Sequence, residues 1–288
     1  MFKIKLIIFA ILLVVSISNS GAYGELSEEA GNIPIATKWS IDATGDTGRA
    51  SIQYIYLVHS LPDTKGTGFL INTGHIITNE HVIRGRNENS IIAYSSFGEK
   101  ITFKKVISDA SRDIAILFPS KQIKGGLNVE KKLNYKVGES VITWGHPLGY
   151  NGPPPLLSVG YLSGFKSYNT DVPGNILKHL VINGAFNPGN SGGPLFRAND
   201  NNVIGIVVSK HAPMPEYLIS AVNALKSNQF GMQYEKTDNT GAKVNVSEAQ
   251  IVADVLEYFR SMTQVMIGEA IDAAELIDFL NEQGIIVR

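Results

Sequence analysis

The sequence predicts an all-β protein of two packed six-stranded antiparallel barrels, followed by a helical C-terminal extension. Three observations support this fold class. Short β-branched stretches bounded by Gly, Pro, Asn or Asp recur between residues 50 and 209. They form two similar sets, separated by a Lys- and Gly-rich connection at residues 120–136. From about residue 247 the apolar spacing becomes helical.

The two sets of strands account for the two barrels. The first set is residues 51–59, 68–72, 75–78, 90–94, 101–108 and 113–118. The second set is residues 140–144, 156–165, 179–182, 194–196 and 203–209. We expect a cleft where the two barrels meet.

The end of the chain predicts helices. Ser247 and Gln250 resemble a capping box, and apolar residues follow them at helical spacing. A second helix is expected over residues 269–282, with Gly284 as its stop signal. We therefore interpret residues 229–288 as a helical extension that packs on the barrels.

The N-terminal residues have the layout of a secretory signal peptide over residues 1–22. Lys3 and Lys5 precede the apolar run 6–15, and small polar residues follow it. The pattern leaves cleavage after Ser20 or Ala22 open. The apolar run is too short to span a bilayer comfortably, so no stable membrane anchor is expected after cleavage. We predict a secreted or periplasmic protein with an N-terminal arm or linker at 23–48 and a main domain at 49–228.

Composition excludes several function classes. The chain has 288 residues, 44% of them hydrophobic, which suits a globular protein with a sizeable core. With 25 basic and 26 acidic residues the net charge is -1, so no nucleic-acid or anionic-lipid partner is implied. The absence of Cys excludes a thiol nucleophile and a Cys metal site, and it favours a bacterial exported product over a disulfide-rich animal one.

A nucleophile is predicted in the segment Gly189-Asn190-Ser191-Gly192-Gly193-Pro194, between two expected strands. Acyl transfer needs a serine on a tight turn, where a base can reach its Oγ and backbone N–H groups converge beside it. Glycines on both sides allow that turn. Ser191 is therefore the candidate nucleophile, although a lone Ser in a Gly-rich turn is usually only a turn.

Two further segments supply the partners that Ser191 needs. His81 follows the apolar strand ending at Thr78 and can act as the base. Asp113 opens an apolar strand, and a partly buried carboxylate there needs a hydrogen-bond donor such as a histidine N–H. Asp109 competes for this role but lacks the apolar strand that follows Asp113. The other histidines, at positions 59, 75, 146, 179 and 211, are given structural roles.

The three segments resemble the triad motifs of trypsin-like serine proteases, in that family's order of His, Asp and Ser. The resemblance is closest to the bacterial HtrA/Deg branch, through Gly66-Thr67-Gly68-Phe69, Gly145-His146-Pro147-Leu148-Gly149 and Asn187-Pro188-Gly189. It covers about residues 50 to 228 and includes 217–225, which is similar to the segment that ends the family's protease domain. The branch typically carries C-terminal PDZ domains, for which residues 231–288 are too short and too helical.

The resemblance implies a serine endopeptidase with His81, Asp113 and Ser191 as its triad and the N–H groups of Gly189 and Ser191 as its oxyanion hole. It implies polypeptide substrates and no metal or organic cofactor. The sequence leaves the oligomeric state open. The alternative is a catalytically weak or inactive binding protein on the same fold.

The resemblance also predicts a specificity pocket. Ala185 occupies the base of that pocket, where trypsin carries an acid, and Val207, Val208 and Ser209 would form its wall. An uncharged, apolar pocket favours small or medium aliphatic residues over Arg or Lys.

Overall fold

The computed structural model describes residues 35–43, 50–60, 64–132, 134–148, 150, 154–169, 176–198, 200, 202–210, 216–237, 242–262 and 267–287. The predicted signal peptide lies outside these residues. The predicted arm is described only over residues 35–43, which form helix α2 (Ile35–Ala43), an element that was not predicted.

The first sheet contains seven strands in the order β5-β4-β1-β2-β3-β7-β6. All its neighbouring strands are antiparallel. Their bounds are β1 Ile55–Ser60, β2 Thr64–Leu70, β3 Ile76–Thr78, β4 Ile91–Ser95, β5 Lys100–Ile101, β6 Phe103–Asp109 and β7 Ile114–Pro119. Helix α4 (Glu80–Ile83) and the 3-10 helix η1 (Glu88–Ser90) lie between β3 and β4.

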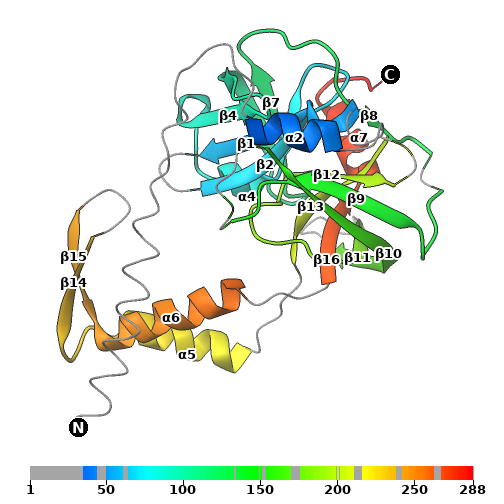
Figure 1. Ribbon diagram of the computed structural model, residues 1–288. Coiled ribbons are helices and arrows are strands. Elements are labelled where there is room, and N and C mark those ends of the chain that lie inside the picture. The colour runs from blue at the N-terminus through cyan, green and yellow to red at the C-terminus, as the bar shows by residue number, and fades with distance from the viewer. Residues whose placement is uncertain are drawn as a thin grey trace. The chain divides into compact units, whose positions relative to one another are not determined.

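The second sheet has the order β12-β9-β10-β11-β16-β13-β8, and pairing of β12 with β13 closes six of its strands into a barrel. Its strands are β8 Asn128–Val129, β9 Ser140–Gly145, β10 Leu156–Asn169, β11 Ile176–Gly184, β12 Pro194–Arg197, β13 Asn202–Lys210 and β16 Ile267–Asp272. β8 pairs with β13 in parallel. The predicted all-β fold of two packed barrels is confirmed, with the second sheet closed through six strands and the first a nearly closed sheet of seven; Figure 1 shows the strands and the C-terminal helices.

A shared core joins the two sheets. Buried side chains of the first sheet, such as Ile55 and Phe69, pack in one cluster with Trp144 and Phe196 of the second and with Leu276 of the last helix. Smaller clusters fill each sheet separately, around Val58 and Leu117 in the first barrel. The loops between the two sheets are thereby held against a common apolar base.

The C-terminal region differs from the predicted helical extension. Helices α6 (Glu248–Met262) and α7 (Ala273–Glu282) are present, and the capping box forms, with Ser247 N–H donating to Gln250 Oε1. Between them, however, β16 pairs with β11 and β13 and completes the second barrel. Residues 269–272 were therefore wrongly predicted to be helical, because pairing with two strands outweighs the helix propensity of Glu and Ala.

Residues 216–262 form elements of their own between β13 and β16. Helix α5 (Glu216–Ser227) packs against α6, and strands β14 (Gln233–Thr237) and β15 (Lys243–Ser247) form an antiparallel hairpin. The segment 217–225, which resembled the end of the family's protease domain, lies in α5. That expectation was wrong, because the closing strand of the barrel is β16.

Candidate active site

His81 and Asp113 come together at the edge of the first barrel. His81 lies in the first turn of α4, directly after β3, and Asp113 lies directly before β7, which pairs with β3. The Nδ1 atom of His81 lies 2.7 Å from Asp113 Oδ2, and the backbone N–H of His81 donates to Asp113 Oδ1 at 2.9 Å. Two bonds to one carboxylate fix both the backbone and the ring of His81. The second ring nitrogen, Nε2, is left for a reacting group.

The backbone of Asp113 is held in an unusual conformation. Its φ of 55° makes it the one non-glycine residue with positive φ among those described. Such a conformation costs about 1–3 kcal/mol and persists only when neighbours hold it. The side chain of Asn79 does so, because its Nδ2 donates to the Asp113 carbonyl at 2.9 Å. The competing carboxylate, Asp109, instead closes a turn by accepting from Ser111 and Arg112.

Ser191 lies on the tight turn between β11 and β12, and it is 5% exposed. The turn is held by backbone bonds on its far side, from Gly192 N–H to the Val207 carbonyl and from Val207 N–H to the Gly193 carbonyl, both 2.8 Å. Gly192 has a φ of 85°, and a Cβ there would lie 2.1 Å from the Thr67 carbonyl oxygen. Only glycine fits this position, as the Gly-rich motif suggested.

The turn presents two backbone donors. The carbonyls of Pro188 and Asn190 accept from Leu148 N–H at 2.7 Å and from Gly193 N–H at 2.9 Å. In a trans peptide the N–H points away from the C=O. The N–H groups of Gly189 and Ser191 therefore point away from those partners, and within the described part of the chain neither meets an acceptor. They are suited to bind an oxyanion.

The structure does not join Ser191 to His81. The Ser191 hydroxyl donates to the Val208 carbonyl in β13, and among the described residues no hydrogen bond links it to the imidazole. Catalytic hydrogen bonds are often loose or absent without substrate. Rotation of the Ser191 side chain about χ1 would release its hydroxyl from β13.

Part of the chain matches a known protein family. Residues 66–206 match the trypsin-like peptidase domain, and this stretch includes His81, Asp113 and Ser191. The chain contains a trypsin-like peptidase domain.

Several similar proteins are named as HtrA or Do-like serine proteases. The serine protease Do-like HtrB of Bacillus subtilis is 36% identical over 138 residues, which are 46% of this chain and 29% of HtrB. Protease Do-like 1 of Arabidopsis chloroplasts is 30% identical over 164 residues, 54% of this chain and 35% of that protein. The chain thus spans about a third or less of the length of these relatives.

Solved structures show the same fold. The Rv3671c protease in its inactive form has a TM-score of 0.55 and 19% identity, covering 83% of this chain and 93% of that one. The HtrA-type protease AlgW with a tripeptide has a TM-score of 0.52 and 19% identity, covering 81% and 62%. At this identity the likeness concerns the fold of the peptidase.

The predicted specificity pocket is brought together only in part. Ala185 is half-buried just after β11, and Val208 is half-buried in β13 beside the nucleophile. The Val207 side chain, in contrast, lies fully inside the core of the second barrel with Phe186, and the structure does not bring it to the predicted pocket wall. Both faces of β13 are buried before this point, with Ile206 in the shared core and Val207 in the core of the second barrel, and the pairing with β16 shifts register after Val207. The side chain of Ser209 lies outside the described atoms.

One residue of the site had no predicted role. The buried Thr67 in β2 contacts the nucleophile turn through both its hydroxyl and its backbone. The only sequence signal was its place in the Gly66-Thr67-Gly68-Phe69 motif of the peptidase. A Cβ at Gly66 would lie 3.2 Å from the Ser191 carbonyl oxygen, which shows how closely β2 approaches the turn.

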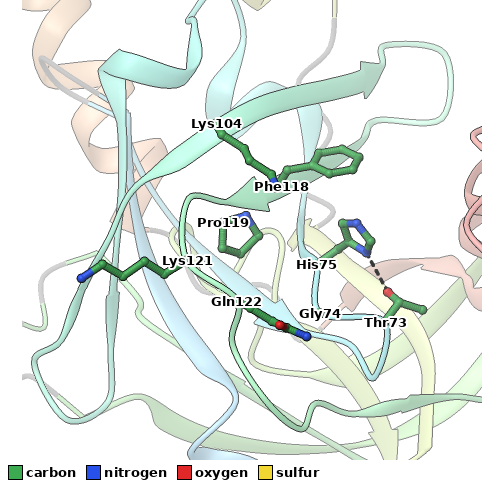
Figure 2. Close-up of a pocket in the computed structure, with 8 residues that line it drawn as sticks. All are labelled: Thr73, Gly74, His75, Lys104, Phe118, Pro119, Lys121 and Gln122. Atoms are coloured by element: carbon green, nitrogen blue, oxygen red, sulfur yellow. Dashed lines mark hydrogen bonds between the residues drawn. The ribbon is translucent and has the colours of Figure 1, made fainter.

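A second cavity is lined by residues other than the predicted triad. This cavity has a volume of about 260 Å³ and lies on the first barrel. Figure 2 shows the residues that line it, Thr73, Gly74, His75, Lys104, Phe118, Pro119, Lys121 and Gln122. Burial, with a smaller effect from Lys104, lowers the pKa of His75, which lies 2.8 Å from the Thr73 hydroxyl. No group of three or more possible metal ligands occurs among the described residues. No helix in the same residues is long and apolar enough to cross a membrane.

Proposed function

We propose that this peptidase is an exported serine endopeptidase that cleaves polypeptides through an acyl-enzyme. The observation that carries the proposal is the paired His81 and Asp113, together with a serine turn that offers two N–H donors without acceptors. The relatives named as HtrA-type and Do-like proteases support the reaction class.

The reaction follows from the roles of these groups. The Ser191 Oγ attacks the carbonyl carbon of the scissile bond while its proton passes to Nε2 of His81. The N–H groups of Gly189 and Ser191 stabilise the negative oxygen of the tetrahedral intermediate. His81 then gives the proton to the leaving amine, and the C–N bond breaks. Water, deprotonated by His81, releases the acyl group and restores Ser191, while Asp113 stabilises the imidazolium throughout.

Specificity and location belong to the same proposal. The uncharged Ala185 and the aliphatic Val208 beside Ser191 suit a small or medium aliphatic residue before the cleaved bond. Names of relatives such as the probable periplasmic DegP-like endoprotease of Hahella chejuensis support a periplasmic or secreted location. A clear preference for Arg or Lys among matched peptides would overturn the specificity.

One observation favours the alternative of a catalytically weak binding protein. The Ser191 hydroxyl is engaged by the Val208 carbonyl rather than by His81. The two functions differ in one assay, the cleavage of casein by the mature protein and by its Ser191→Ala variant. An endopeptidase cuts casein and loses this activity in the variant. Equal cleavage by both proteins, or none by the folded wild type, would contradict the proposal.

A further inference from the structure

Thr67 uses all its hydrogen-bonding groups around the nucleophile turn. The residue is 0% exposed and belongs to β2 of the first barrel. Its hydroxyl accepts from His146 N–H at 3.0 Å and donates to the Gly189 carbonyl at 2.7 Å. Its N–H donates to the Ser191 carbonyl at 2.8 Å, and its own carbonyl accepts from the Thr78 hydroxyl at 2.7 Å. One side chain therefore joins β2, the loop at His146 and the turn.

The Thr67 hydroxyl holds one side of the Gly189–Asn190 peptide, and the Asn190 N–H, which donates to the Asn187 carbonyl at 3.0 Å, holds the other. Gly189 has a φ of 95° and no side chain. Its backbone dihedral angles are therefore less restricted than those of any other residue type. The peptide between Gly189 and Asn190 lies between the two donors proposed for the oxyanion. A shift of this peptide that alters φ of Gly189 or ψ of Asn190 would move the Gly189 carbonyl away from β2 and change the angle between the two N–H groups. The Thr67 hydroxyl is the described group that binds this carbonyl.

We propose that Thr67 is a positioning residue for the oxyanion-binding turn. Its hydroxyl fixes the Gly189 carbonyl against β2, and its N–H fixes the Ser191 carbonyl, so that the N–H groups of Gly189 and Ser191 stay aligned. Thr67 touches neither substrate nor the reacting atoms. It acts through the turn, and the inference rests on the proposed endopeptidase function of that turn.

The matched pair Thr67→Val and Thr67→Ser tests this role. Valine keeps the shape but removes the hydroxyl, whereas serine keeps the hydroxyl. Activity is measured on a quenched fluorescent peptide that spans a bond cut in casein. Loss of one oxyanion donor costs about 10²–10³-fold in kcat, so partial misalignment in Thr67→Val should cost about 10- to 100-fold. KM should stay within about twofold, and Thr67→Ser should keep most of kcat.

A second readout separates alignment from stability. A peptide aldehyde forms a tetrahedral adduct with the serine, so its affinity should fall in Thr67→Val by about the same factor as kcat. Ser96→Ala is the control, because Ser96 is also fully buried in the first barrel, with its hydroxyl 2.9 Å from the Ile52 carbonyl. That variant should lower Tm and leave kcat of the folded protein unchanged.

The outcomes separate the inference from the proposed function. If wild type cuts the peptide, Ser191→Ala does not, and folded Thr67→Val keeps full kcat and aldehyde affinity, the role of Thr67 is refuted and the endopeptidase stands. If wild type and Ser191→Ala behave alike, the proposed function fails. If Thr67→Val does not fold, Thr67→Cys, a similar-sized residue with a weak donor, replaces it, and the same fall in kcat without a change in KM is expected.

Discussion

Replacing Asp272 by Ala should destabilise the protein strongly, because this residue ties the C-terminal region into the second barrel. Asp272 is 0% exposed and lies where β16 ends and α7 begins. Its Oδ1 accepts from Ala274 N–H at 3.0 Å and so caps the helix. Its Oδ2 accepts from the Tyr135 hydroxyl and lies 3.0 Å from Lys178 Nζ.

The expected loss follows from these three contacts. A lost N-cap costs about 1 kcal/mol. A hydrogen bond from a hydroxyl to a buried charged group contributes about 1.5–3 kcal/mol. The Lys178 side chain is 44% exposed, so its ion pair adds less than about 1 kcal/mol. The free energy of unfolding should therefore fall by about 3–5 kcal/mol, and Tm by about 10 °C at this chain length.

Denaturation in guanidinium chloride, followed by the fluorescence of the buried Trp144, measures this change. Asp278→Ala is the control, because Asp278 is an exposed acid on the same helix and should change stability by less than about 0.5 kcal/mol. Asp272→Asn retains an oxygen that can accept from the Ala274 N–H, so its free energy of unfolding should lie between those of Asp272→Ala and Asp278→Ala. If Asp272→Ala were as stable as Asp278→Ala, the argument that the C-terminal region completes the barrel would be refuted.

Three further predictions concern the turn, the acid range and the C-terminal helix. Gly192→Ala should abolish casein cleavage, since its Cβ would lie 2.1 Å from the Thr67 carbonyl oxygen; retained cleavage would contradict the described turn. Burial opposes ionisation of Glu269, but hydrogen bonds from His179 and Tyr168 and the charge of Lys166 lower its pKa from 4.5 to about 2. Because this pKa is lower in the folded state, ionised Glu269 stabilises the fold above pH 4.5, by at most about 3 kcal/mol of unfolding free energy. This stabilisation is lost as the pH falls towards 2. Urea unfolding between pH 5 and 2 should show a shallower fall for Glu269→Gln, and identical slopes would contradict the shift. Arg112→Ala should lower the free energy of unfolding by about 1 kcal/mol, because the Arg112 guanidinium forms ion pairs with Glu282 at 2.6 Å and Asp109 at 2.6 Å. A double-mutant cycle with Glu282→Gln measures the coupling free energy between Arg112 and Glu282. Additive effects of the two substitutions would contradict a stabilising ion pair.

The sequence predicted the parts of the site whose chemistry is local. A histidine after β3 and a carboxylate before β7 are read from strand ends, and the pairing of these two strands brings them to 2.7 Å. The Gly-rich turn around Ser191 was recognisable because its glycines allow backbone conformations that other residues rarely adopt. Each of these features depends on a few adjacent residues.

What the sequence did not predict depends on distant contacts. β16 consists of residues that would also suit a helix, and only pairing with β11 and β13 makes them a strand. The inward direction of Val207 follows from the exact register of β13, which a stretch of valines does not reveal. Thr67 acts across 122 residues of sequence, on the Gly189 carbonyl, and no local pattern marks such a contact.

The central claim is that Ser191 is a competent nucleophile on this peptidase fold. It is tested most directly by incubating the mature protein with a fluorophosphonate and locating the added mass by peptide mapping. We predict a single adduct on Ser191, strongly slowed in His81→Ala and absent in Ser191→Ala. A folded wild-type protein that gains no adduct, or gains it on another residue, would contradict the account.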